Sequence, residues 1–207
     1  YFKHILTKEE VSDITPYRER FAYVGAFSAT IKDLKKSWEV FEFEPNQIIH
    51  YRRLENVGVT RADLQAFCDA VCDYAEDGSY FSVQSLKKTG FNSDLFDELG
   101  FSDWFYGSLL STDDRFSWSQ MFGNYVLYKG HERITTQTFE KTLIEAYGSI
   151  DVYDLMTEMT ETYGCRNLSR SDLISKVKGT DVYYDEYLDR LYANEGLYSR
   201  ELDEMEG

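Results

Sequence analysis

The chain has 207 residues, a length that allows one large domain or two or three small ones. Hydrophobic residues make up 43% of it and aromatic residues 16%, enough to fill a packed core, so the composition argues against global disorder. The net charge of −15 argues against nucleic-acid binding over the whole surface, which needs clustered Lys and Arg, and no apolar run reaches the length of about 18 residues that predicts a membrane span.

The first sixty residues predict two helices and a hairpin. Thr7 and Glu10 have the spacing of a capping box, which predicts a helix that starts directly after Thr7. Apolar residues at helical spacing predict a second helix over residues 31–38. Alternating aromatic residues, the turn at residues 44–47 and a further apolar run then predict a hairpin whose returning strand covers residues 48–54.

Residues 60–132 contain the clearest pattern in the chain. Thr60, with an acidic residue three positions later, predicts the start of a helix that carries an apolar stripe. A short helix with Leu86 and an aromatic helix over residues 101–110 follow. Residues 116–128 predict two strands joined at a Gly-Asn pair, because these two residue types tolerate the positive φ angles of a tight hairpin turn.

The remaining residues predict the same kinds of element. A helix is expected from Thr135, and a second, amphipathic helix over residues 152–163. Ser169 or Ser171 suits the N-cap of a third helix. Apolar and aromatic residues between 182 and 192 predict one more hairpin.

The order helix, helix and hairpin therefore occurs three times. Residues 115–130 also align without gaps with residues 181–196, and aromatic or apolar character is shared at several strand positions. We predict a mainly α-helical α+β fold with small β-hairpins, built from tandem units. The predicted units, the first of which has no clear start, and a frayed acidic tail cover residues 1–59, 60–132, 133–196 and 197–207.

This order of elements resembles the winged-helix superfamily, in which the helix before the hairpin is often inserted into the major groove of DNA. The run Gly100–Tyr106 is similar to C-terminal regions of bacterial sigma-factor-like, transcription-associated proteins. The resemblance implies tandem winged-helix units in a larger protein that works in transcription or DNA transactions. The superfamily hosts many functions, so the function has to be argued from individual sites.

Basic residues balance acidic ones only in the first unit. Residues 1–60 hold 9 basic and 9 acidic side chains, whereas residues 131–207 hold 8 and 17. If the superfamily role applies, the basic cluster on the helix before the first hairpin and on its returning strand would contact nucleic acid; the alternative is an ordinary solvated helix face. The residues of this candidate site are Lys32, Lys35, Lys36, Arg52 and Arg53.

The acidic second and third units favour a protein partner, and docking of such a partner is the leading hypothesis for function. Trp and Tyr are frequent anchors at protein interfaces, although the alternative for each ring is a place in the core. The candidate partner-binding residues are Asp103, Tyr106, Trp118 and Tyr128. Two alternatives stay open: a DNA-binding regulator that uses the first unit, and an acidic inhibitor that mimics DNA. The oligomeric state is left open by the sequence.

An enzyme is not predicted, because the chain contains no Gly-rich phosphate loop, no nucleophile elbow and no spaced pair of metal-ligating residues. Cys68, Cys72 and Cys165 accompany no CxxC or paired-histidine motif, so we expect free thiols and neither a metal nor a cofactor. No signal peptide is recognisable at Tyr1. The free thiols predict a protein of the reducing cytoplasm.

Overall fold

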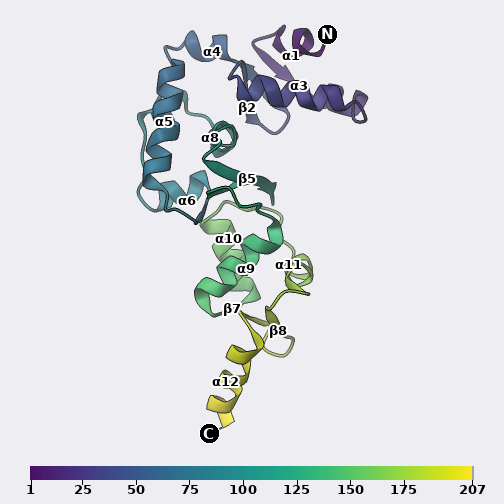
Figure 1. Cartoon of the computed structure of the whole chain (residues 1–207), viewed down its shortest axis with the longest axis vertical. Coiled ribbons are helices and arrows are strands. Elements are labelled where there is room, and N and C mark those ends of the chain that lie inside the picture. Colours follow the sequence, from purple (N-terminus) through teal and green to yellow (C-terminus); the bar gives the residue numbers. More distant parts are fainter. Residues whose placement is uncertain (207) are drawn as a thin grey trace. The chain divides into compact units, whose positions relative to one another are not determined.

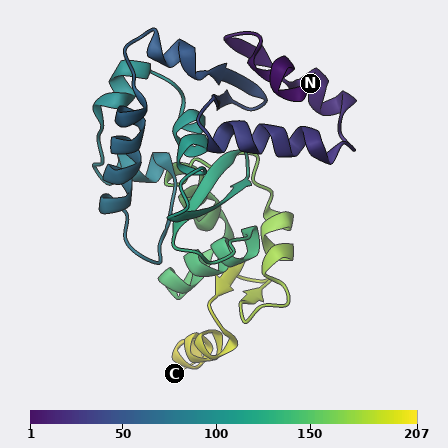
Figure 2. The ribbon, with the colours of Figure 1, turned by 45° about the horizontal axis from the view of Figure 1, so that its top comes forward.

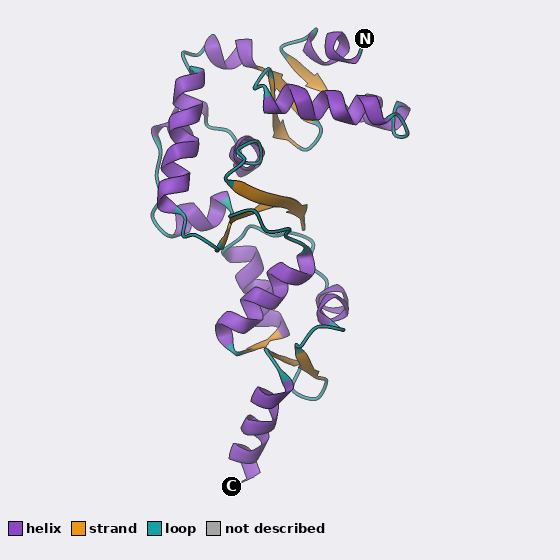
Figure 3. Cartoon of the chain, in the orientation of Figure 1, coloured by secondary structure: helices purple, strands orange, loops and turns teal. Residues whose placement is uncertain are grey.

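The computed structural model describes residues 1–206, which form helices and three separate three-stranded sheets (Figures 1 and 3). The prediction of a mainly helical α+β fold with small hairpins is confirmed. In this part of the chain, no helix has both the length and the apolar character needed to cross a bilayer.

Each sheet belongs to one of three segments that we call the first, second and third repeat. The first repeat contains α1 (Phe2–Thr7), β1 (Val11–Asp13), α2 (Thr15–Arg20), α3 (Gly25–Lys36), β2 (Val40–Glu44) and β3 (Gln47–His50), and is followed by α4 (Tyr51–Glu55). The second repeat contains α5 (Arg61–Tyr74), β4 (Tyr80–Phe81), α6 (Val83–Lys88), α7 (Asp94–Leu99), α8 (Asp103–Leu110), β5 (Phe116–Met121) and β6 (Asn124–Lys129). The third repeat contains α9 (Thr136–Tyr147), β7 (Ser149–Asp151), α10 (Val152–Glu161), α11 (Arg170–Val177), β8 (Tyr183–Asp185) and β9 (Arg190–Tyr192), and is followed by α12 (Glu195–Glu206).

The three sheets have the same topology. In each of them the last strand of the repeat lies between the first and the second, in the orders β1-β3-β2, β4-β6-β5 and β7-β9-β8. Each repeat also begins with a helix and places its remaining helices between the first strand and the hairpin. The strand that precedes these helices was not predicted from the sequence in any repeat, because two or three residues are too few to show an alternating pattern.

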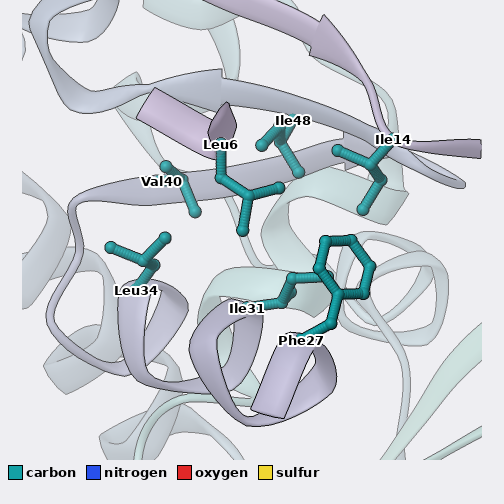
Figure 4. Packing of buried hydrophobic residues seen from close by; sticks show 7 residues of the cluster. All are labelled: Leu6, Ile14, Phe27, Ile31, Leu34, Val40 and Ile48. Carbon is teal, nitrogen blue, oxygen red and sulfur yellow. The ribbon is translucent and has the colours of Figure 1, made fainter. Parts of the chain in front are cut away.

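The core of the first repeat lies between α3 and the sheet (Figure 4). Phe27, Ile31 and Leu34 have helical spacing, which puts them on one face of α3, and all three are buried. Burial of this face holds the short strands in place, since a small sheet is unstable unless it packs on another element. The labelled residues of the cluster are Leu6, Ile14, Phe27, Ile31, Leu34, Val40 and Ile48.

Two predictions about the first sixty residues are wrong. Thr7 ends α1 and does not begin a helix; its hydroxyl points back along α1 and donates a hydrogen bond to the Lys3 carbonyl at 2.9 Å. The chain then extends into β1, which pairs with β3. The returning strand also ends earlier than predicted, at His50, whose Nδ1 accepts the Arg52 N–H at 3.1 Å and so caps α4.

The predicted hairpin of the second repeat is confirmed as β5 and β6. Its turn lies one residue earlier than predicted, at Phe122 and Gly123, which have φ angles of 50° and 69°. Both central residues of this turn type need positive φ, so glycine is favourable at the second position and Phe122 is strained at the first.

Helix α8 of the second repeat packs against strand β2 of the first (Figure 2 shows the same ribbon from a second angle). The Phe105 ring lies 5.8 Å from the Phe41 ring, and the Phe101 ring lies 5.8 Å from the Phe43 ring, measured between ring centres. Ser102 Oγ donates to the Phe43 carbonyl at 3.2 Å. We call these contacts the α8–β2 joint.

Polar contacts surround the α8–β2 joint. Trp38 Nε1 donates to Thr112 Oγ1 at 2.8 Å, and Arg61 donates to the Ser37 carbonyl at 2.8 Å. The first repeat and most of the second therefore form one compact unit 1, residues 1–117 and 127–131. Unit 2 comprises residues 118–126 and the chain from residue 132 onwards.

Unit 2 contains the third repeat and α12. The tail that was predicted to fray is helical, because α12 covers Glu195–Glu206; Gly207 lies outside the described residues. The Tyr198 ring stacks on the Tyr183 ring with 4.2 Å between centres, and Glu201 Oε1 lies 3.3 Å from Arg190 Nη1. These contacts attach the first half of α12 to the hairpin β8–β9.

We expect Phe105→Ala to lower the free energy of unfolding of unit 1 by about 3–5 kcal/mol, because the side chain is fully buried in the α8–β2 joint. Urea unfolding followed by the fluorescence of Trp38 and Trp104 measures this change. Tyr153→Ala, which removes an exposed ring, should change stability by less than about 0.5 kcal/mol. Equal effects of the two substitutions would contradict the placement of Phe105.

Candidate functional site

The five basic residues predicted to contact nucleic acid lie on two helices. Lys32, Lys35 and Lys36 are on α3, whereas Arg52 and Arg53 are on α4. Several of them already have acidic or polar neighbours. Lys36 Nζ lies 3.0 Å from Asp114 Oδ1, Arg53 Nη1 lies 4.0 Å from Glu10 Oε2, and Arg52 Nε donates to His50 Nδ1 at 3.4 Å.

Lys35 has a structural role. Its Nζ lies 3.2 Å from Oε2 of Glu42, a residue that is only 4% exposed. The other carboxylate oxygen accepts the Asn46 N–H at 3.1 Å. A buried carboxylate stays ionised only when it is paired and hydrogen-bonded, so Lys35 is needed inside the first repeat. It is therefore a poor candidate for a phosphate contact.

The aromatic residues predicted to bind a partner differ in burial. Tyr106 is fully buried, its hydroxyl donates to the Leu95 carbonyl at 3.1 Å, and burial raises its pKa to about 12. This corrects the prediction for Tyr106, which faces the interior. Trp118 is 43% exposed in unit 2, whereas Tyr128 is partly buried in unit 1 with its ring 5.1 Å from the Tyr80 ring.

The fourth predicted partner residue, Asp103, is paired with Lys87 at the start of α8. From Phe105 to Leu110 every residue of α8 is buried. A helix in this position, before the hairpin, would have to be exposed to enter a DNA groove. The structure instead uses α8 as an internal element of unit 1.

The groove between α11 and β8 in unit 2 is open, but Arg170 in this groove already forms an ion pair with Asp189. The groove has a volume of about 440 Å³ and contains Arg170, Lys178 and Glu186 along its sides. The Arg170 guanidinium donates to both Asp189 carboxylate oxygens and, at 2.6 Å, to the Tyr184 hydroxyl. A phosphate would have to displace Asp189, which disfavours the groove as an anion site.

Unit 2 also has an acidic surface with an exposed tyrosine, which we call the acid–tyrosine face and define as Tyr147, Asp151, Asp154 and Glu158. Tyr147 is 54% exposed and Tyr153 is 61% exposed. Every residue of this face borders a recess of about 340 Å³, together with Arg190, whereas Tyr153 does not border it.

Local structure and charge explain the acid–tyrosine face. The Asp151 carboxylate accepts the Tyr153 N–H at 2.8 Å and caps α10, while the polar side of this amphipathic helix presents Asp154 and Glu158 one turn apart. Partial burial and the neighbouring Glu158 carboxylate raise the pKa of Tyr147. The spacing of Asp154 and Glu158 was the signal in the sequence that could have indicated this face. Acidic residues alone did not distinguish this helix from other helices.

Comparisons with known proteins give no family or relative: no protein-family model, curated protein or solved structure matches the chain. Within the described residues, no group of three or more His, Cys, Asp and Glu side chains is arranged to hold a metal ion. Functional inference therefore rests on the surfaces described above.

We expect Lys35→Ala to destabilise unit 1 by on the order of 3 kcal/mol, because it leaves the buried Glu42 carboxylate without its closest cation. Lys32→Ala, on the exposed side of the same helix, should change stability by less than about 0.5 kcal/mol. Urea unfolding measures both changes. Adding Glu42→Gln to Lys35→Ala should restore part of the loss; no recovery would show that the ion pair is not the cause.

Proposed function

We propose that the chain is a non-catalytic interaction module of a larger transcription or DNA-transaction protein, and that it docks a protein partner through the acid–tyrosine face of unit 2. The observation that carries this proposal is the exposed Tyr147 ring beside the carboxylates of Asp151, Asp154 and Glu158 at an open recess. The repeated order of elements and the shared strand order support tandem winged-helix-like repeats as the scaffold.

The helices that precede the second and third hairpins support a protein partner over DNA. Helix α8 is buried, and Arg170 at the start of α11 is bound by Asp189. Residues 131–207 contain 17 acidic and 8 basic side chains, so the electrostatic field around most of unit 2 repels phosphate.

The chemistry of the acid–tyrosine face indicates a basic partner segment. Tyrosine offers a large ring with few rotatable bonds and is enriched among the residues that dominate binding energy at interfaces. Carboxylates around the ring attract Lys and Arg and repel acidic competitors, which gives specificity and a faster association rate. We therefore propose a cationic protein segment as the occupant.

The proposed location is the cytoplasm. Cys68, Cys72 and Cys165 are free, and the structure buries Cys68 and Cys165. Burial raises the pKa of both thiols to about 12. Unreactive free thiols suit a reducing compartment, where disulfides rarely persist.

Photo-crosslinking tests the docking proposal. A photoreactive phenylalanine analogue at position 147, which is exposed and borders the recess, should crosslink in cells that make the protein to a protein with a basic segment. Asp154→Lys with Glu158→Lys should abolish that crosslink, because the partner's cations would then be repelled. Mass spectrometry identifies the crosslinked species.

Two controls make the crosslinking result specific. Glu132→Lys with Glu186→Lys changes the charge of unit 2 by the same amount at exposed positions outside the acid–tyrosine face, and should leave the crosslink intact. Equal loss in both double variants would point to net charge alone. Crosslinks to nucleic acid, or none at all, would contradict docking at this face.

A second candidate function is duplex DNA binding by the first repeat. The exposed side of α3 carries the small residues Ala26, Ser28 and Ala29, followed by Lys32 and Lys36. Small side chains allow a helix to approach a groove closely, and the lysines would meet the phosphates. Arg20 on the preceding helix α2 is also exposed and was missed by the sequence prediction, whereas the exposed Arg18 lies 3.8 Å from Glu42 Oε1.

If the first repeat binds DNA, Lys32→Glu with Lys36→Glu should weaken binding to a labelled duplex and lower the slope of log affinity against log salt by about 2, one for each lost phosphate contact. Lys178→Glu with Arg200→Glu in unit 2 is the matched control and should leave the slope unchanged. Fluorescence anisotropy over a salt series measures the slope. Identical slopes for the wild type and the Lys32 and Lys36 variant would exclude this function.

The acidic mimic of DNA finds less support. Such a mimic needs a continuous row of carboxylates with the spacing of phosphates. Ion pairs such as Lys129–Asp77 in unit 1 and Lys141–Asp181 in unit 2 place cations among the carboxylates and interrupt a row of negative charge.

A further inference from the structure

Glu140 lies inside unit 2 without a partner. It is on the apolar side of α9 between Phe139 and Leu143, and its side chain is 0% exposed. Neither carboxylate oxygen has a hydrogen-bond partner among the residues that the structure describes. An ionised carboxylate in such a place is strongly destabilised, so the buried form of Glu140 holds its proton.

The elements packed on α9 do little to stabilise the ionised form of Glu140. Helix α11 brings Lys176, which favours the ionised form of Glu140, and Asp172, which opposes it. The segment before α11 brings the buried thiol of Cys165. The strands β7 and β9 also pack on α9, and their charged residues are Asp151 and Arg190.

The contact between α9 and α11 includes a polar link at its edge. Gln137 Nε2 donates to the Lys176 carbonyl at 2.8 Å, three residues before Glu140 on α9. Lys176 itself is exposed, so its ammonium group stays in water and attracts Glu140 only weakly. Separation of α11 from α9 would therefore hydrate the Glu140 carboxylate, which is buried in the packed form.

We propose that Glu140 is a proton-controlled latch: protonated Glu140 permits α11 to pack on α9, and loss of its proton opens this packing. This inference is independent of the proposed docking function. Burial raises the pKa of Glu140 from an ordinary value of 4.5 to about 8. In the open form the carboxyl meets water, and its pKa returns toward the ordinary value.

The direction of the pH effect follows from proton counting. Between pH 4.5 and about 8, the closed form holds the Glu140 proton and the open form has released it. Each unit of pH in this range therefore raises the ratio of open to closed form up to about tenfold, and no further rise is expected above about pH 8. Histidines do not obscure this window, because His4, His50 and His131 all belong to unit 1.

Hydrogen exchange of the whole chain tests the latch. Amides of α9 and α11, measured by mass spectrometry at pH 5.5 and 7.5 and corrected for intrinsic exchange rates, give the opening ratio at each pH. The wild type should open about a hundredfold more at pH 7.5 than at pH 5.5. Glu140→Gln, a neutral side chain of the same shape, should show the same opening ratio at both values.

Three further measurements keep the test decisive. Glu145→Gln on the exposed side of α9 should retain the wild-type pH dependence. Glu140→Met should also remove the pH dependence, and it serves as the test variant if Glu140→Gln does not fold. Labelling of Cys165 by a thiol reagent, corrected for the reactivity of a free thiol, should follow the same opening ratio. A flat wild-type ratio, or an undiminished pH dependence in Glu140→Gln, would overturn the proposal.

Discussion

The α8–β2 joint is the interaction on which the rest of unit 1 depends. Pairs of aromatic rings, Phe41 with Phe105 and Phe43 with Phe101, hold the hairpin of the first repeat on the last helix of the second. Large aromatic rings bury more apolar surface than other side chains and dominate the energetics of a core. Once α8 is used in this way it has no exposed side, and the second repeat cannot present it to DNA or to a protein. The surfaces that we propose for binding therefore lie elsewhere, on α3 in unit 1 and on α10 in unit 2.

Two buried glutamates show how differently the two units treat charge. Glu42 in unit 1 is paired with Lys35 and hydrogen-bonded by the Asn46 N–H, so both of its carboxylate oxygens have partners. Glu140 in unit 2 has no such partners among the described residues, and burial raises its pKa to about 8. A pair of this kind fixes a structure, whereas a lone carboxyl group makes packing depend on pH. The acid–tyrosine face lies in the same unit as Glu140, so the proposed latch would make the packing of its scaffold depend on pH.

Much of the secondary structure could be predicted, because it depends on local patterns. The Thr60 and Asp63 capping box begins α5, and aromatic alternation defines β5 and β6. Features that depend on distant residues could not be predicted. Strand β1 forms only by pairing with β3, and the His50 side chain replaces a usual capping residue and converts the predicted end of a strand into α4. Tyr106 was mistaken for a surface residue, although α8 is apolar on all sides, a pattern that indicates burial.

A double-mutant cycle tests directly whether α8 is an internal element held by β2. Phe41→Leu, Phe105→Leu and the double variant are compared in urea unfolding of the whole chain. Rings in contact should give a coupling energy of about 0.5–1.5 kcal/mol, because the second substitution costs less once the first has removed the partner ring. Additive effects of the two substitutions would show that the rings do not interact, and would contradict the joint between the first two repeats.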